Sequence, residues 1–370
     1  RLAVDEARAR LGRAGGFKFV NVRYDRPDVE PPAWSPVFEL EPGRELTVDV
    51  LAGFRSYELL YGGVEVLRRN LLGLGHTAEF RLVQSFRSTD GYVTYSVPDA
   101  FADDVTLFAL VNALSREEVS FRREELRGGI GLRKLLERSD QQVGLRYNYE
   151  FLRAVDAPVS ARTVALSEDQ PEVSSLVAEW SLERRDSAIT PRRGYHLAGL
   201  LEFALPEFGG EARFLRPEVE ASFHQPLGGG RFLSLGTQLT AIGFPDGDGR
   251  VPFNKRIFPG GDDSVRGYQR GEAAPANAAG EIIGAEIALV WNLELEQLLT
   301  PSWSLVAFAD GVAESADINN SPVDEVLWSI GGGLRWNTVI GPVRLEYGHN
   351  LERRRGDPSG TLHFSVGFPF

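Results

Sequence analysis

A chain of 370 residues with a mean hydropathy of -0.19 and no apolar run near the required length of about 18 residues excludes membrane-spanning helices. A formal net charge of -12 and a pI of about 5.1 argue against nucleic-acid binding, which needs a basic face. The chain has no cysteine, so disulfides and thiolate metal sites are excluded.

Residues 1–42 have the pattern of one helix followed by two strands. Apolar residues fall on one helical face over residues 2–13, and Gly15 and Gly16 end the pattern. Alternation from Phe17 to Tyr24 predicts a strand, and a second short strand is predicted near residues 37–40. Because so few residues cannot bury a core alone, we expect this segment to be the end of a larger upstream domain.

From Glu45 onward the chain is divided into segments of about ten residues with strict alternation, which is typical of transmembrane barrels. Trp328, Ile330 and Leu334 share one face of such a segment, whereas Ser329 and Arg335 share the other. We therefore predict an all-β transmembrane barrel of about sixteen antiparallel strands over residues 43–370. The alternative is a soluble β-sandwich or propeller, which also alternates.

The C-terminal segment favours the barrel. It alternates up to an aromatic last residue, with Leu362, Phe364, Val366, Phe368 and Phe370 on one face. In a soluble protein this strand would leave an apolar, unpaired edge, whereas a closed barrel has no edge. We interpret residues 361–370 as the closing strand and residues 45–54 as the first strand.

One connection, at about residues 244–280, is far longer than a usual hairpin loop and is therefore either functional or disordered. It contains the sequence Arg256-Ile-Phe-Pro-Gly-Gly-Asp-Asp-Ser-Val-Arg-Gly-Tyr268. Aromatic residues and glycines are too dense there for a flexible linker, so we predict an ordered loop.

Within this loop, Gly260-Gly261-Asp262, Ser264 and Val265-Arg266-Gly267-Tyr268 resemble the signature loop of the BamA/TamA superfamily of outer-membrane assembly factors. The resemblance implies periplasmic POTRA modules, which combine helix and strand, followed by a sixteen-stranded barrel. Residues 1–42 would then be the C-terminal part of a POTRA domain. The tyrosine at the end of the motif favours the TamA branch slightly over the BamA branch.

In the resembled family this loop folds into the lumen, where its arginine meets acidic residues of the next two strands. Asn292-Leu-Glu-Leu295 and Phe308-Ala-Asp-Gly311 match those positions. A buried arginine must be paired, and its planar fork suits carboxylates. The resemblance thus implies a lumenal lock, whose members are Arg266, Gly267, Tyr268, Gly260, Gly261, Glu294 and Asp310. The alternative for Arg266 is an ordinary solvated loop arginine.

The family also closes its barrel through few hydrogen bonds between the first and last strands, and this seam opens as a lateral gate. The matching gate residues are Leu46, Val48, Val50, Phe364, Val366, Phe368 and Phe370. The implied function is assembly or insertion of outer-membrane proteins. The alternatives are a two-partner-secretion transporter pore and a general porin.

No residue pattern indicates catalysis. Asp262 and Asp263 are interpreted as loop residues, and Ser264 lacks the preceding glycine of a nucleophile elbow. The five histidines have no ligand spacing, so we expect no enzyme activity, no metal and no cofactor. The expected partners are nascent outer-membrane proteins or autotransporters, the lipid bilayer, and a periplasmic or inner-membrane protein that binds the POTRA part. The expected location is the bacterial outer membrane.

Overall fold

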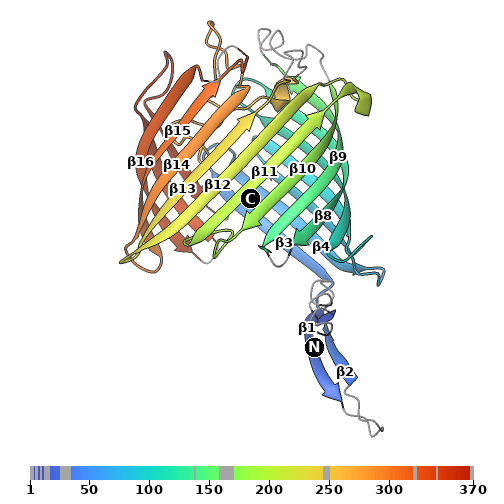
Figure 1. Cartoon of the computed structure of the whole chain (residues 1–370). Coiled ribbons are helices and arrows are strands. Elements are labelled where there is room, and N and C mark those ends of the chain that lie inside the picture. Colours follow the sequence, from blue (N-terminus) through green and yellow to red (C-terminus); the bar gives the residue numbers. More distant parts are fainter. Residues whose placement is uncertain are drawn as a thin grey trace.

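Sixteen antiparallel strands close into a barrel, as the alternation predicts (Figure 1). The computed structural model describes Val4, Ala7, Arg8, Leu11 and residues 17–25, 35–136, 139–157, 171–244, 251–319, 323–338 and 341–366. Within these residues, strands that are consecutive in sequence are neighbours in the barrel, and β18 meets β3 to close it.

The barrel strands vary in length from 7 residues in β18 to 15 residues in β8. Their bounds are β3 (Leu46–Arg55), β4 (Leu59–Leu71), β5 (His76–Ser85), β6 (Ser88–Val97), β7 (Val105–Glu117), β8 (Arg122–Leu136), β9 (Gln141–Val155), β10 (Glu172–Glu183), β11 (Gly194–Ala204), β12 (Phe214–Gly228), β13 (Arg231–Ala241), β14 (Ile287–Leu298), β15 (Trp303–Ser315), β16 (Glu325–Thr338), β17 (Gly341–Asn350) and β18 (Gly360–Val366).

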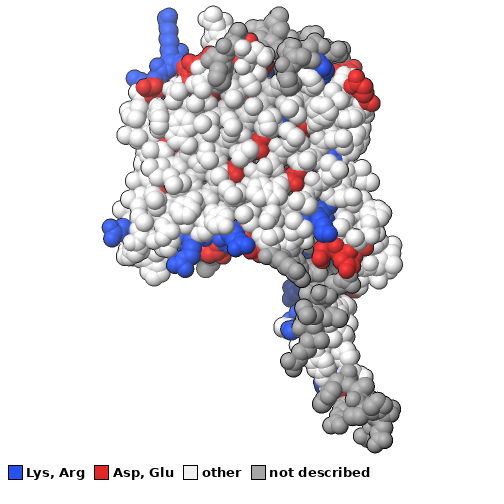
Figure 2. Space-filling view, viewed as in Figure 1, with Lys and Arg blue, Asp and Glu red and all other residues white. Residues whose placement is uncertain are grey.

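Alternation separates the outer and inner faces of the wall. On β14, Leu289, Leu293 and Leu295 are exposed on the outside, whereas Asn292 and Glu294 point inward and contact the long loop. Figure 2 shows the result on one face: the barrel wall carries few charged side chains, which gather instead at its two ends. This apolar band is the surface that a bilayer covers.

The N-terminal segment lies outside the barrel, beyond the end at which β3 begins (Figure 1). β1 (Phe17–Asp25) and β2 (Ser35–Pro42) form a two-stranded antiparallel sheet. The described residues Val4, Ala7, Arg8 and Leu11 are helical. These elements follow the predicted order of helix, strand and strand. None of the described helices has the length and apolar character needed to cross a membrane.

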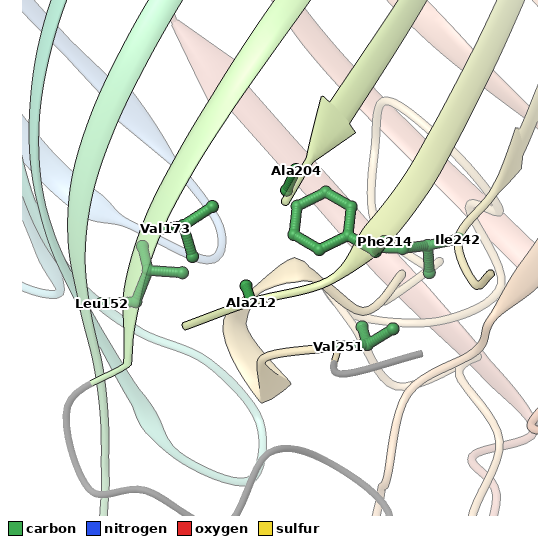
Figure 3. Packing of buried hydrophobic residues seen from close by; sticks show 7 residues of the cluster. All are labelled: Leu152, Val173, Ala204, Ala212, Phe214, Ile242 and Val251. Carbon is green, nitrogen blue, oxygen red and sulfur yellow. The ribbon is translucent and has the colours of Figure 1, made fainter. Parts of the chain in front are cut away.

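The long connection runs from residue 242 to residue 286, between β13 and β14. Its first residues join a buried apolar cluster with the ends of β9 to β12, which consists of Leu152, Val173, Ala204, Ala212, Phe214, Ile242 and Val251. Figure 3 shows the Phe214 ring lying between Ala204 and Ile242. This packing attaches the beginning of the loop to the wall. The loop then continues through the short 3-10 helix η3 (Phe253–Lys255).

Candidate functional site

The tip of the long loop lies inside the barrel and is held there by Arg266. Its guanidinium donates two parallel hydrogen bonds to Asp310, with Nε–Oδ2 and Nη2–Oδ1 distances of 2.8 Å each. Nη1 donates to Glu294 at 2.8 Å and to Glu346 at 3.1 Å. A charged, bidentate pair of this kind is both strong and directional. The structure therefore brings together Arg266, Glu294 and Asp310, the three charged residues on which the sequence-based lock depends.

The carboxylates around Arg266 are shared with a second arginine. Arg335 of β16 donates to Glu294 at 2.6 Å and 2.8 Å and to Glu346 at 2.7 Å. The side chains of Asp310 and Glu346 are 0% and 7% exposed, and a buried charge without a partner is costly, so these cations stabilise both carboxylates. Two arginines and three carboxylates form one buried network, of which Glu346 and Arg335 were not predicted as members.

Phe308, which lies on the same face of β15 as Asp310, also contacts Arg266. The ring of Phe308 is buried, and the Arg266 guanidinium lies 3.5 Å from its centroid, as in a cation–π contact. Asn292 completes this surface, because its side-chain amide donates to the Ser264 carbonyl at 2.6 Å and to Asp310 at 2.8 Å. The guanidinium of Arg266 is thus contacted by an aromatic ring on one side and by carboxylates around it.

The other predicted loop residues have backbone or packing roles. Gly260 and Gly261 have φ values of 121° and 106°, which disfavour any residue with a side chain. Tyr268 is fully buried, and its hydroxyl donates to Asp357 at 3.0 Å. Burial, and then the Asp357 carboxylate, raise the pKa of this hydroxyl above its ordinary value. It therefore remains a donor at neutral pH.

Gly267 allows the loop backbone to touch the wall. A Cβ at this position would lie 1.6 Å from the side-chain oxygen of Asn350, and a Cβ at Gly348 of β17 would lie 2.3 Å from the Arg266 carbonyl oxygen. The backbones of the loop and of β17 therefore pack directly against each other, and only glycine permits this approach.

The seam between β18 and β3 is much shorter than any other strand pairing in the described barrel. Only Ser365–Arg55 and Val366–Phe54 are in register there, whereas each of the other neighbouring pairs has seven or more such partners. The amide of Ser56 adds one hydrogen bond, to the Phe364 carbonyl at 2.9 Å. The barrel therefore closes through only a few backbone contacts.

β18 pairs with only one end of β3 and not along its whole length. Among the described residues, no β18 residue pairs with Leu46, Val48 or Val50, whose side chains are exposed. Phe364 and Val366 belong to β18, and the Phe364 ring lies 5.5 Å from that of Phe54. Phe368 and Phe370 lie outside the described residues. The two strands meet at the C-terminal end of β3, because the stagger of a barrel shifts neighbouring strands along each other.

Residues 70–370 match the family model of the Omp85 superfamily domain. The chain belongs to the Omp85 superfamily. It is similar to the outer membrane protein assembly factor BamA of Nitratidesulfovibrio vulgaris, with 27% identity over 336 residues, 88% of this chain and 42% of the relative. The corresponding values for BamA of Neisseria meningitidis serogroup B are 25% identity, 52% and 28%. The chain thus spans less than half the length of either relative.

Solved structures show the same fold. BamA from Haemophilus ducreyi lacking POTRA domains 1–3 superimposes with a TM-score of 0.80 at 19% identity, covering 98% of this chain and 77% of that one. CdiB from Acinetobacter baumannii gives a TM-score of 0.64 at 14% identity, covering 96% and 66%. The solved structures confirm the barrel, the family model confirms the predicted superfamily, and the BamA relatives together with the barrel confirm the location in the bacterial outer membrane. The slight preference for the TamA branch stays a prediction.

The Omp85 loop has a second anchor, which the sequence did not reveal. Lys255 is buried, and its Nζ lies 2.9 Å from Glu150 of β9 and 3.0 Å from Glu202 of β11. Arg127 of β8 pairs with the same Glu150 at 3.0 Å. In the order of strands, β8 and β9 lie nearly opposite β15 to β17, so the loop is tied to two distant parts of the wall.

Neighbouring residues strengthen this second anchor. Asn254 donates to the backbone carbonyls of Glu124 and Arg153, at 3.4 Å and 3.1 Å. The fully buried side chain of Arg256 pairs with Glu286, near the return to β14, at 2.9 Å. Two features of the sequence could have indicated this anchor: Lys255 lies among apolar residues, and Glu150 and Glu202 lie on inward faces of their strands. No local pattern links these distant positions.

Replacing Lys255 with methionine is expected to destabilise the folded barrel by about 3–5 kcal/mol, because Glu202 and Glu150 would lose a buried counter-charge. Urea unfolding in detergent micelles measures this change. Lys134→Met, at an exposed position of β8, is the matched control and should change stability little. Equal stability of the two variants would show that Lys255 does not anchor the loop.

Replacing Gly348 with alanine is expected to displace the loop tip, because the new Cβ would meet backbone atoms of Arg266 and Gly267 at 2.3–2.7 Å. Such overpacking typically costs about 1–3 kcal/mol. Trypsin cleavage after Arg266 or Arg270 should therefore become several-fold faster. Gly128→Ala is the control, since a Cβ there meets no atom within 4 Å. If Gly348→Ala is cleaved after Arg266 and Arg270 no faster than Gly128→Ala, the backbones of the loop and of β17 do not pack directly against each other.

Proposed function

We propose that this chain is the barrel part of an outer-membrane protein assembly factor, which inserts other barrels by exposing the edges of its seam. The observation that carries the proposal is the short pairing of β18 with β3, which leaves Leu46–Gly53 without a β18 partner among the described residues. The BamA relatives, which are named as assembly factors, support it.

The physical driving force comes from unpaired backbone groups. In a bilayer each unsatisfied N–H or C=O costs several kcal/mol, so an open strand edge strongly favours pairing with another strand. A client segment can satisfy this edge by β-augmentation. No nucleotide and no catalytic group is required, and the proposal assigns no enzymatic reaction, metal or cofactor to the chain.

The lumenal lock would keep the loop in place while the seam works. Arg266, which is followed by Gly267 and Tyr268, would hold the tip against Glu294 and Asp310. Gly260 and Gly261 would form the turn that returns the tip to the wall. In this proposal the gate residues are Leu46, Val48 and Val50 on β3 and Phe364 and Val366 on β18, together with Phe368 and Phe370, which lie outside the described residues.

We further propose that residues 1–42 are the end of a POTRA domain in the periplasm, where it would bind a periplasmic or inner-membrane partner. The helix–strand–strand order and the paired β1 and β2 support this assignment. The clients would be nascent outer-membrane proteins or autotransporters.

The CdiB fold similarity favours a protein-transporting pore as the second candidate function. Conductance separates the two candidates. An assembly factor whose loop fills the lumen should give small, intermittent currents in planar bilayers, whereas a transporter should give a large open pore once the loop leaves. A large, stable pore with the loop still protected from protease would overturn the assembly proposal.

A further inference from the structure

The last strand is bonded to the loop tip as well as to its neighbouring strands. The Thr361 hydroxyl donates to the Gly267 carbonyl at 2.8 Å, and His363 Nε2 lies 2.8 Å from the Arg266 carbonyl. Since a carbonyl only accepts, His363 is the donor in this contact. Both tip carbonyls are therefore held by β18 side chains.

These two residues lie on the inward face of β18. Thr361 and His363 alternate with Leu362 and Phe364, of which Leu362 is exposed on the outer face. β17 adds a third hydrogen bond, from the Asn350 amide to the Gly267 carbonyl at 3.0 Å. The tip thus contacts the wall from inside, just beside the seam.

The tip also reaches the other side of the seam. Asp263 Oδ2 lies 4.0 Å from Arg55 Nη1, and Arg55 is the register partner of Ser365. A cavity of about 160 Å³ lies behind the seam, lined by Arg55 and the turn after it, by loop residues and by residues 361–364. The contacts of Asp263, Arg266 and Gly267 therefore reach both strands of the seam.

We propose that residues 263–267 form an internal clasp that holds the seam closed, with Thr361 and His363 as positioning residues on β18 and Arg55 on β3. A role for the clasp in seam opening rests on the proposed function, whereas the contacts themselves do not depend on it. It also assigns a role to Asp263, which the sequence marked only as one of two adjacent loop carboxylates.

The clasp acts because the tip is fixed elsewhere. Arg266 ties the tip to β14, β15 and β17, so a hydrogen bond from β18 to the tip fixes β18 relative to those strands. The seam itself contributes only two register pairs. Moving β18 away from the tip breaks both of these hydrogen bonds. The Arg266 carbonyl then loses its His363 donor, whereas the Gly267 carbonyl keeps the Asn350 amide.

The test is hydrogen exchange, read by mass spectrometry, of the full chain in liposomes. In the double variant Thr361→Val with His363→Leu, the amides of β18 should exchange at least about tenfold faster, because local opening becomes easier. Amides of β14 and β15 should exchange as in the parent. Thr237→Val is the matched control, since it removes a similar hydroxyl–carbonyl bond between β13 and β14, far from the seam.

Conservative replacement separates positioning from general packing. His363→Gln keeps a donor near the position of Nε2, so β18 should exchange at nearly the parent rate. On the other strand, Asp263→Asn should speed exchange at the end of β3, whereas Asp262→Asn should not, since Asp262 forms no ion pair among the described residues. Parent-like exchange of β18 in the double variant would overturn the clasp.

The exchange experiment needs no client protein, so the clasp can fail while the assembly function holds. Conversely, faster exchange of β18 in a chain that never inserts a client would support the clasp and contradict the proposed function.

Salt provides an independent check of the Arg55–Asp263 contact, because a partly exposed pair weakens with ionic strength.

Discussion

Cysteines at Phe54 and Val366, once joined as a disulfide, are expected to abolish insertion of client barrels into liposomes. The two residues are register partners across the antiparallel seam. Such partners lie about 4.5–5.5 Å apart at their Cα atoms, which is within disulfide range. Because the seam has so few pairs, one covalent bond holds it shut. Insertion should fall at least about tenfold on oxidation, since no edge is then available to pair with a client strand in lipid.

The chain has no cysteine of its own, so the engineered pair is the only possible disulfide. Val50 and Val64 are register partners between β3 and β4, and cysteines there provide a control disulfide away from the seam. The control should leave insertion unchanged, and reduction should restore the seam variant. If the oxidised seam variant inserts clients at the parent rate, lateral opening is not the mechanism.

Arg266→Ala is expected to cause the second large effect, a loss of about 3–5 kcal/mol of stability together with release of the loop. It leaves Asp310, Glu346 and Glu294 with one cation fewer in a buried site. The first measurement is urea unfolding in micelles, and the second is the rate of protease cleavage within residues 251–286.

Two variants calibrate this result. Arg266→Lys keeps the charge but not the fork, so it should recover only part of the lost stability. Arg270→Ala lies in the same loop, but its ion pair with Glu118 is 3.6 Å long and partly exposed, so about 0–1 kcal/mol is expected. The lock would be wrong if Arg266→Ala and Arg270→Ala had equal effects.

The sequence alone determined the barrel, the approximate number of strands and the two faces of β16. Alternation with period two is a local property, so residues such as Trp328 and Ser329 are assigned to opposite faces without any knowledge of their neighbours. The loop motif around Arg266 was equally visible, because its residues are contiguous. Glu294 and Asp310 were predicted because two short segments match the positions of the acidic residues in the resembled family.

Only the tertiary structure decided which distant residues meet. Glu346 and Arg335 join the lock, and Lys255 meets Glu150 and Glu202, because strand stagger and the path of the loop place them together. The seam register, with Val366 opposite Phe54, depends on the same stagger. Such pairings arise from closing the whole barrel, and no local pattern of residues encodes them.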